Sequence, residues 1–239
     1  MALRLTRVVT ALVLVAGGAL MHAASWQRWA GFCPWGSSEE TASCNTRMDH
    51  LYDFLFVADP WEPIGNASEL AGISLLLVAL AFLLLPWALL GRPGLLVTAA
   101  LGVSALAVAD AGLAVLRSGL AGEVVDPVGP GGGWTLFLVV PTSVVIWAAV
   151  LARGWARAGA IFVVLGSPPV ALFTYAIGPF DAAPWWEAYA GDLTALGGLC
   201  LLVAAARRPA PDRAPATEPA TEPATGDVAE PATGDVAVA

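Results

Sequence analysis

The sequence predicts an all-α integral membrane protein, and the composition and the grouping of apolar residues are the observations that predict it. Of the 239 residues, 58% are hydrophobic and 13% are charged, whereas soluble domains have about 45–50% apolar and about 25% charged residues. The apolar residues fall into six blocks, each near the length of about 20 residues that an α-helix needs to cross a bilayer. We therefore expect a six-helix transmembrane bundle with a disulfide-clamped outer loop and a disordered cytoplasmic tail. All 11 basic residues are Arg, and Ala, Gly and Pro are abundant, which is typical of a GC-rich genome such as that of an actinobacterium.

The polytopic domain is predicted over residues 1–206. Its spans are expected at residues 8–25, 69–90, 95–116, 134–152, 158–178 and 189–206, with the outer loop over residues 26–68. The first span, with its basic leader, also fits a secretory signal cleaved near residues 23–25, and both alternatives stay open. Pro168 and Pro169 interrupt the fifth predicted span, and a proline pair there predicts a hinge because proline removes a helical hydrogen bond.

The distribution of Arg predicts the orientation of the chain. With six spans, eight Arg residues lie on the side that carries both termini and three lie on the other side. Cytoplasmic loops collect basic residues near the ends of spans, so both termini are expected in the cytoplasm and the protein in the plasma membrane. The 13 acidic residues that precede the tail all fall in the outer loops or in the outer halves of spans. The outer face is therefore predicted to be acidic.

The outer loop contains Cys33 and Cys44, separated by ten residues. Outside the cytoplasm such a pair is expected to form a structural disulfide, since a small exported loop cannot build its own core. Catalytic redox pairs have closer thiols, as in Cys-x-x-Cys, and that spacing is absent from the sequence. Cys200 falls within the sixth predicted span and is interpreted as an apolar filler.

The outer loop also contains residue types that bind metals, at Asp49, His50 and Asp53. Asp49 and Asp53 would share one face of a helix, whereas His50 would point elsewhere. Zinc sites usually need three or four convergent ligands. We therefore interpret these residues as a solvated polar face, and we predict neither a metal nor a cofactor.

Five polar residues are predicted at similar depth on the outer side of five different spans. They are His22, Glu69, Asp110, Tyr175 and Asp192. An ionisable residue near the centre of a span costs about 2.5–3.5 kcal/mol on insertion scales, so Asp110 is the clearest candidate for a function. The five residues are a candidate outward-facing cavity. The alternatives are helix-dipole partners for Glu69 and Asp192, and interfacial positions for His22 and Tyr175.

The residues from 207 onward change abruptly in character. Pro, Ala, Thr, Glu, Gly and Asp dominate residues 207–239, and the octet Glu-Pro-Ala-Thr-Gly-Asp-Val-Ala occurs twice in succession. Such a segment buries too little apolar surface to offset the entropy of ordering it. A disordered cytoplasmic tail is therefore predicted.

The function expected from these features is that of a non-enzymatic envelope membrane protein. No phosphate-binding loop with Lys, Gly-x-Ser-x-Gly or His-Glu-x-x-His motif occurs, and the net charge of −8 argues against nucleic acid as a partner. The expected partners are the lipid bilayer and another envelope protein, met at the acidic outer face. The first alternative is a small proton- or cation-linked transporter that uses Asp110. The second is a membrane-embedded enzyme acting on a lipid or isoprenoid through Asp110, Asp192 and His22.

Overall fold

The computed structural model describes residues 2–35, 41–48, 57, 61–125, 132–170 and 185–207, with the backbone alone described at residues 46–48 and 132–139. The regular secondary structure of these residues is entirely helical. The helices are α1 (Ala2–Trp29), α2 (Ala42–Met48), α3 (Ala67–Leu90), α4 (Leu95–Ala121), α5 (Gly132–Leu151), α6 (Gly154–Leu165) and α8 (Trp186–Ala206). The chain divides into two units, residues 1–207 and residues 208–239. The second unit, which forms the predicted tail from residue 208 onward, lies outside the described residues.

Four of the described helices are long and apolar enough to cross a membrane, namely α1, α3, α4 and α8. They cover the first, second, third and sixth predicted spans, which supports a multi-pass membrane protein. Helix α5 has 20 residues and coincides with the fourth predicted span. Helix α6 has only 12 residues, so the fifth predicted span is not one continuous helix.

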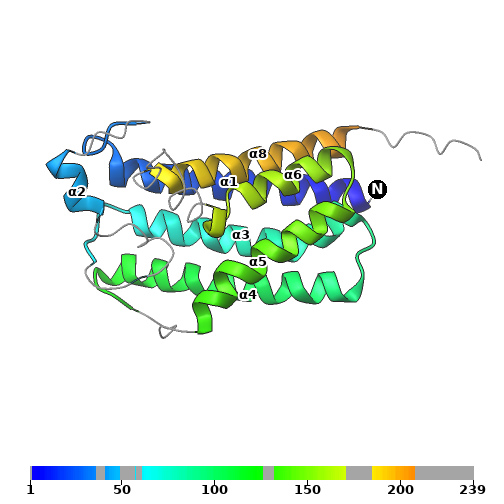
Figure 1. Cartoon of the computed structure of the whole chain (residues 1–239), viewed down its shortest axis with the longest axis horizontal. Coiled ribbons are helices and arrows are strands. Elements are labelled where there is room, and N and C mark those ends of the chain that lie inside the picture. The colour runs from blue at the N-terminus through cyan, green and yellow to red at the C-terminus, as the bar shows by residue number, and fades with distance from the viewer. Residues whose placement is uncertain are drawn as a thin grey trace, which may run out of the picture. The chain divides into compact units, whose positions relative to one another are not determined.

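Helices α1, α3, α4, α5, α6 and α8 lie lengthwise beside one another (Figure 1), and their pairwise contacts close a ring in chain order. Helix α1 contacts α3, and α3 contacts α4. The series of contacts continues from α4 to α5, from α5 to α6 and from α6 to α8, and α8 contacts α1. Short connections at residues 91–94 and 152–153 join α3 to α4 and α5 to α6, as expected for antiparallel neighbours. We call the end where α1 begins and α8 ends the arginine end, and the opposite end, where α1 ends, the disulfide end.

Glycine allows the closest helix contacts in the ring. A Cβ on Gly18 of α1 would overlap the carbonyl oxygen of Gly191 on α8. At the contact of α6 with α8, a Cβ on Gly159 would lie 2.8 Å from the carbonyl oxygen of Gly197, and one on Gly197 would lie 2.9 Å from that of Gly159. Membrane helices use small residues in this way because backbones can then approach each other directly.

Arg7 holds three helices together at the arginine end. Its Nε donates a hydrogen bond of 2.9 Å to the carbonyl oxygen of Ala88 near the end of α3. Its Nη1 donates one of 3.2 Å to the carbonyl oxygen of Ala204 near the end of α8. The last carbonyl groups of a helix lack partners within it and carry partial negative charge, so a cation is favoured there.

Helix α6 ends immediately before the proline pair. Pro168 has no N–H and its ring would clash with the carbonyl of Val164, while the residue before a proline disfavours helical backbone. The Ser167 side chain instead donates a 2.6 Å hydrogen bond to the Val164 carbonyl oxygen, and the Ser167 backbone N–H donates a 3.0 Å bond to the same oxygen. Residues 168–170 are again helical. The break thus lies at the predicted hinge, on the N-terminal side of Pro168 and Pro169.

Helix α2 was not predicted from the sequence. It begins after Thr41, whose Oγ1 accepts a 3.1 Å hydrogen bond from the backbone N–H of Cys44, as an N-cap residue does. The residues considered as metal ligands, Asp49, His50 and Asp53, lie outside the described residues.

Candidate functional site

The predicted disulfide between Cys33 and Cys44 is present, with the Cα atoms 4.9 Å apart. Both cysteines are buried, and they pack in one apolar cluster with Trp29, Trp185 and Ala188. The bond therefore attaches α2 to the segment that follows α1, and the apolar cluster packs both against the beginning of α8. The two cysteines are 11 positions apart in the sequence. Closing a loop of this length contributes about 3 kcal/mol to the free energy of unfolding in the chain-entropy model.

A buried ion pair joins α1 to α8 beneath the disulfide. Arg28 and Glu187 each expose only 1% of the side chain, and Arg28 Nη1 lies 3.6 Å from Glu187 Oε1. The indole Nε1 of Trp29 donates a 3.1 Å hydrogen bond to Glu187 Oε2. The guanidinium also lies over the Trp29 ring, 4.6 Å from its centre. Burial of two charges is favourable only with such mutual contacts, because water is lost from both.

Sequence reasoning missed this pair. In the predicted topology, Arg28 is one of the three Arg residues on the outer side. Glu187 is one of the 13 acidic residues placed there. The available signal was that each charge stands next to tryptophan at the end of an apolar block. That signal does not specify a partner, since Trp29 and Glu187 are 158 residues apart.

An aromatic cluster surrounds the same end of the bundle. Its members are His22, Trp26, Trp35, Trp185 and Tyr189. Trp35 is central, with its ring centre 4.6 Å from that of Trp185 and 5.0 Å from that of Tyr189. Trp26 and Trp35 are about half exposed. Amphipathic rings of this kind favour the boundary between membrane and water.

Two of the five predicted cavity residues are in contact. His22 Nδ1 lies 3.0 Å from Asp192 Oδ1, and both side chains are partly exposed, by 36% and 50%. The two residues join α1 to α8 next to Trp26, whose ring stacks on His22 at 6.2 Å. An exposed pair of this kind contributes about 1 kcal/mol or less to stability.

The two other predicted cavity residues that the structure describes, Glu69 and Asp110, lie apart from this pair. Glu69 lies in the first turn of α3 and is partly buried beside Gly119 of α4, where a Cβ would be 3.2 Å from its Cδ. Asp110 is exposed on α4. Tyr175 lies outside the described residues.

Asp110 belongs to an exposed stripe along α4, which we call the α4 stripe. The stripe consists of Leu96, Ala99, Val103, Leu106, Asp110, Leu113, Arg117 and Leu120, all of which are exposed. Their spacing alternates between three and four residues, the pattern of a seam between two packed helices. Helix α4 uses its other faces to contact α3 and α5. The stripe is therefore a continuous surface that the ring itself does not cover.

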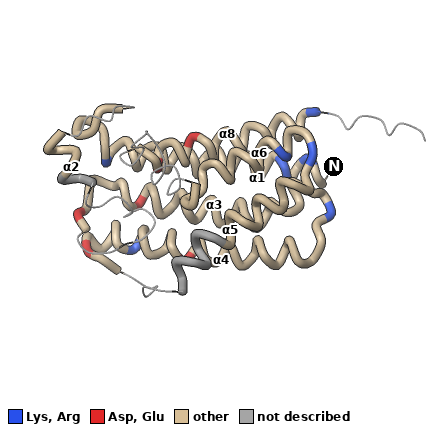
Figure 2. Tube along the Cα trace, in the orientation of Figure 1, with Lys and Arg blue, Asp and Glu red and all other residues tan. Residues whose placement is uncertain are grey.

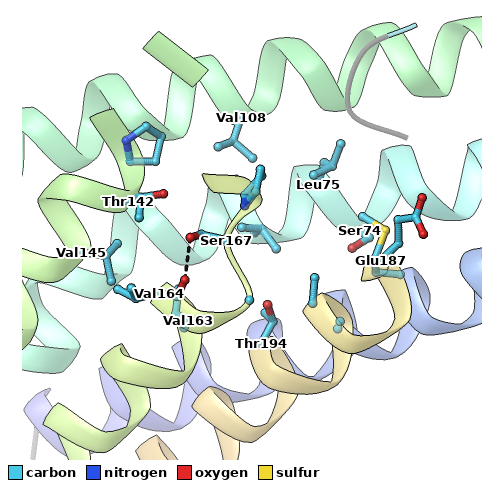
Figure 3. Close-up of a pocket in the computed structure, with 18 of the residues that line it drawn as sticks. Ser74, Leu75, Val108, Thr142, Val145, Val163, Val164, Ser167, Glu187 and Thr194 are labelled. Atoms are coloured by element: carbon cyan, nitrogen blue, oxygen red, sulfur yellow. Dashed lines mark hydrogen bonds between the residues drawn. The ribbon is translucent and has the colours of Figure 1, made fainter. Parts of the chain in front are cut away.

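A cavity of about 100 Å³ lies between the helices of the ring. All six helices of the ring contribute to its lining, which also includes Pro141 of α5 and Pro168 after α6. Figure 3 shows Ser167 and Thr194 at the cavity, with Thr142 and Val145 on one side and Ser74 and Glu187 on the other. None of the four described members of the predicted outer cavity is among the residues that line it.

Cys200 is buried, as expected for a filler, and packs towards Gly159 of α6. Three arrangements of the described residues have the geometry for a function: the braced disulfide end, the α4 stripe and the cavity.

Family models, curated proteins and solved structures were each compared with the chain, and none of them matches it.

Proposed function

We propose that this chain is a six-span protein of the plasma membrane, with both termini in the cytoplasm, that assembles with another membrane protein and catalyses no reaction. The observation that carries this proposal is the exposed carboxyl of Asp110 in the α4 stripe. The partner contributes a spanning helix that covers the stripe. The disulfide end, braced by Cys33–Cys44 and the Arg28–Glu187 pair, serves as a rigid outer platform.

The charge distribution supports this topology. Figure 2 shows Arg gathered at the arginine end of the bundle and most acidic residues nearer the disulfide end. Basic residues collect on the cytoplasmic side of membrane proteins, which supports a cytoplasmic position for the arginine end. The closed ring of six helices supports six spans, with α5 as the fourth and α6 with the following turn as part of the fifth. The packing of α1 against α3 and α8 favours a retained first span over a cleaved signal.

The depth of Asp110 supports a partner at the α4 stripe. The residue lies two positions from the middle of the 27-residue helix α4, which is about 3 Å along the axis. The hydrocarbon core is about 30 Å thick, so Asp110 is near its centre. A carboxyl exposed to lipid at that depth costs about 2.5–3.5 kcal/mol. A hydrogen-bond donor on a covering helix removes this cost.

The charges of the stripe indicate the chemistry of the partner. Arg117 lies on the same stripe seven residues, or two turns, closer to the disulfide end. A second copy packed in parallel would place Asp110 against Asp110 and Arg117 against Arg117, which is repulsive at both positions. The favoured partner is a different spanning helix with a basic or amide side chain at mid-depth and an acidic side chain two turns further out.

The orientation of Asp110 separates assembly from the two alternatives. Both the transporter and the lipid enzyme place Asp110 in a cavity. Val108 lines the cavity, and Asp110 is two residues further along α4, so it points to nearly the opposite side of the helix. Assembly is therefore the function that the geometry favours.

Photo-crosslinking tests the proposal. Benzoylphenylalanine is introduced singly at Leu106 or Leu113 of the stripe, and as matched controls at Ile161 of α6 or Leu199 of α8, which are also exposed. In membranes of the source organism we expect one discrete adduct from the stripe positions alone. Mass spectrometry should place the link in a foreign spanning segment with a basic or amide side chain, and Asp110→Leu should abolish the adduct. Diffuse lipid adducts at all four positions, or an adduct of two copies of this chain, would refute the proposed partner.

A further inference from the structure

The cavity adjoins a helix that stops inside the membrane. Helix α6 has 12 residues, which span about 18 Å at 1.5 Å per residue, whereas the hydrocarbon core is about 30 Å thick. The chain continues through Gly166, Ser167 and Pro168, and all three residues line the cavity. Irregular backbone at membrane depth is tolerated only where protein or a cavity surrounds it, and transporters form their binding sites at such breaks.

A second proline marks the same place. Pro141 lies within α5 and also lines the cavity. Gly18 and Gly191 line it as well, at the closest approach of α1 to α8. The cavity is therefore bounded by two proline-containing segments, of which only the one after α6 is broken, and by the glycine contact of α1 with α8. Dense packing is the rule in protein interiors, so an opening of this size at a helix break is a candidate ligand site.

The polar groups of the cavity are mostly hydroxyl groups. They come from Ser74, Thr142, Ser167 and Thr194. The Ser74 hydroxyl donates to the Gly17 carbonyl oxygen at 2.7 Å, and the Ser167 hydroxyl donates to the Val164 carbonyl oxygen at 2.6 Å, as the dashed line in Figure 3 shows. A hydroxyl that has donated its proton still has lone pairs that can accept. Ser74 and Ser167 thus present acceptors to a ligand.

The charge of the lining is already neutralised. Glu187 is the only ionisable side chain among the described residues that line the cavity. Its carboxylate is engaged by Arg28 and by the indole of Trp29. A charged ligand would therefore enter an apolar site without a counter-ion, which is strongly unfavourable.

We infer that the cavity binds a small uncharged molecule with an apolar body and one hydrogen-bond donor, such as an aromatic or short isoprenoid alcohol. The donor is directed to the oxygen of Ser167 or Ser74, and the body fills the space among Val145, Val163 and Thr194. The cavity, at about 100 Å³, is smaller than an engineered apolar cavity of about 150 Å³ that holds benzene, so the bound part of the ligand is no larger than a single ring. This inference goes beyond the assembly role and does not depend on Asp110.

The probe for this site is a diazirine derivative of benzyl alcohol, used with the full-length protein in lipid vesicles. Labelled positions are mapped by mass spectrometry, with and without excess benzyl alcohol. We expect saturable, competed labelling of residues that line the cavity and linear, non-competed labelling of lipid-facing residues. Thr194→Phe fills the cavity and should lower the saturable labelling about tenfold. Leu196→Phe, on the exposed face of the same helix, is the matched control and should leave it unchanged.

Two further comparisons keep the test decisive. Val163→Phe fills the cavity from α6, so the filling test stands if Thr194→Phe does not fold. Ser167→Ala with Ser74→Ala removes the acceptors at nearly constant volume, and should lower labelling by the alcohol about fivefold while labelling by a toluene diazirine stays constant. Labelling confined to lipid-facing positions, or undiminished in a folded filling variant, would overturn the binding site. An equal response of the two probes would overturn the role assigned to the hydrogen-bond donor.

Discussion

Replacing Glu187 with Gln should destabilise the protein far more than its position at the beginning of a helix suggests. Gln keeps the size of the side chain and an oxygen that can accept from Trp29, but it removes the charge that faces Arg28. At the observed 3.6 Å, the attraction between the charges is about 4.6 kcal/mol for an effective dielectric constant of about 20. Breaking a buried pair typically costs about 3–5 kcal/mol. Arg28 keeps its contact with the Trp29 ring, so we expect about 3 kcal/mol.

The free energy of unfolding can be measured by titrating the protein in mixed micelles with sodium dodecyl sulfate, following circular dichroism. Asp192→Asn is the matched control, because it removes the charge of an ion pair between the same two helices. His22 and Asp192 are partly exposed, so this variant should lose about 1 kcal/mol or less. The double variant Arg28→Met, Glu187→Leu removes both charges and should recover most of the loss.

A double-mutant cycle of Arg28→Met, Glu187→Leu and the double variant decides whether the pair acts as a unit. A coupling energy of about 2 kcal/mol or more is expected for charges in direct contact. The reasoning is refuted if Glu187→Gln costs no more than Asp192→Asn. It is also refuted if the double variant loses the sum of the two single losses, because Arg28 and Glu187 would then act independently.

Three further predictions concern the disulfide, the helix contacts and the tail. Replacing both Cys33 and Cys44 with Ala should cost about 3 kcal/mol in the same titration, and dithiothreitol should lower the stability of the original protein but not that of the variant. Gly18→Val should cost about 1–3 kcal/mol because the valine side chain overlaps the backbone of the facing helix. A Cβ on Gly102 meets nothing within 4 Å, so Gly102→Ala should be neutral or stabilising by up to about 1 kcal/mol. Equal losses of stability in the two variants would contradict the packing argument. Deleting residues 214–239 should leave membrane expression and stability unchanged, and loss of the protein from the membrane fraction would show that the tail is needed.

Local features of the sequence were sufficient for the positions of most helices. An apolar block longer than about 18 residues has one stable arrangement in a bilayer, because the backbone must satisfy its own hydrogen bonds there. The disulfide was predictable for a similar reason, since Cys33 and Cys44 are the only cysteines in the predicted outer loop. The proline pair likewise indicated where the fifth predicted span is broken. Each of these inferences depends on residues that are close together in the chain.

The contacts between helices could not be obtained in that way. Depth along the predicted spans groups His22, Glu69, Asp110, Tyr175 and Asp192, and of the four that the structure describes, His22 and Asp192 are in contact. Depth follows from counting residues along a span, but the direction of a side chain depends on how the helix is rotated against its neighbours. Rotation is the reason that Asp110 is exposed while Val108 lines the cavity.

Features local in the sequence thus predict the class of protein, the apolar helices, the segregation of Arg and the covalent link between Cys33 and Cys44. The contact of Arg28 with Glu187, the closure of the ring through α1 and α8, and the cavity beside the break in α6 arise from the packing of the helices. The two groups of features differ because the underlying interactions differ in range. Hydrophobic length and charge placement act on each segment separately, whereas ion pairing and cavity shape depend on side chains that the fold brings together from distant parts of the chain.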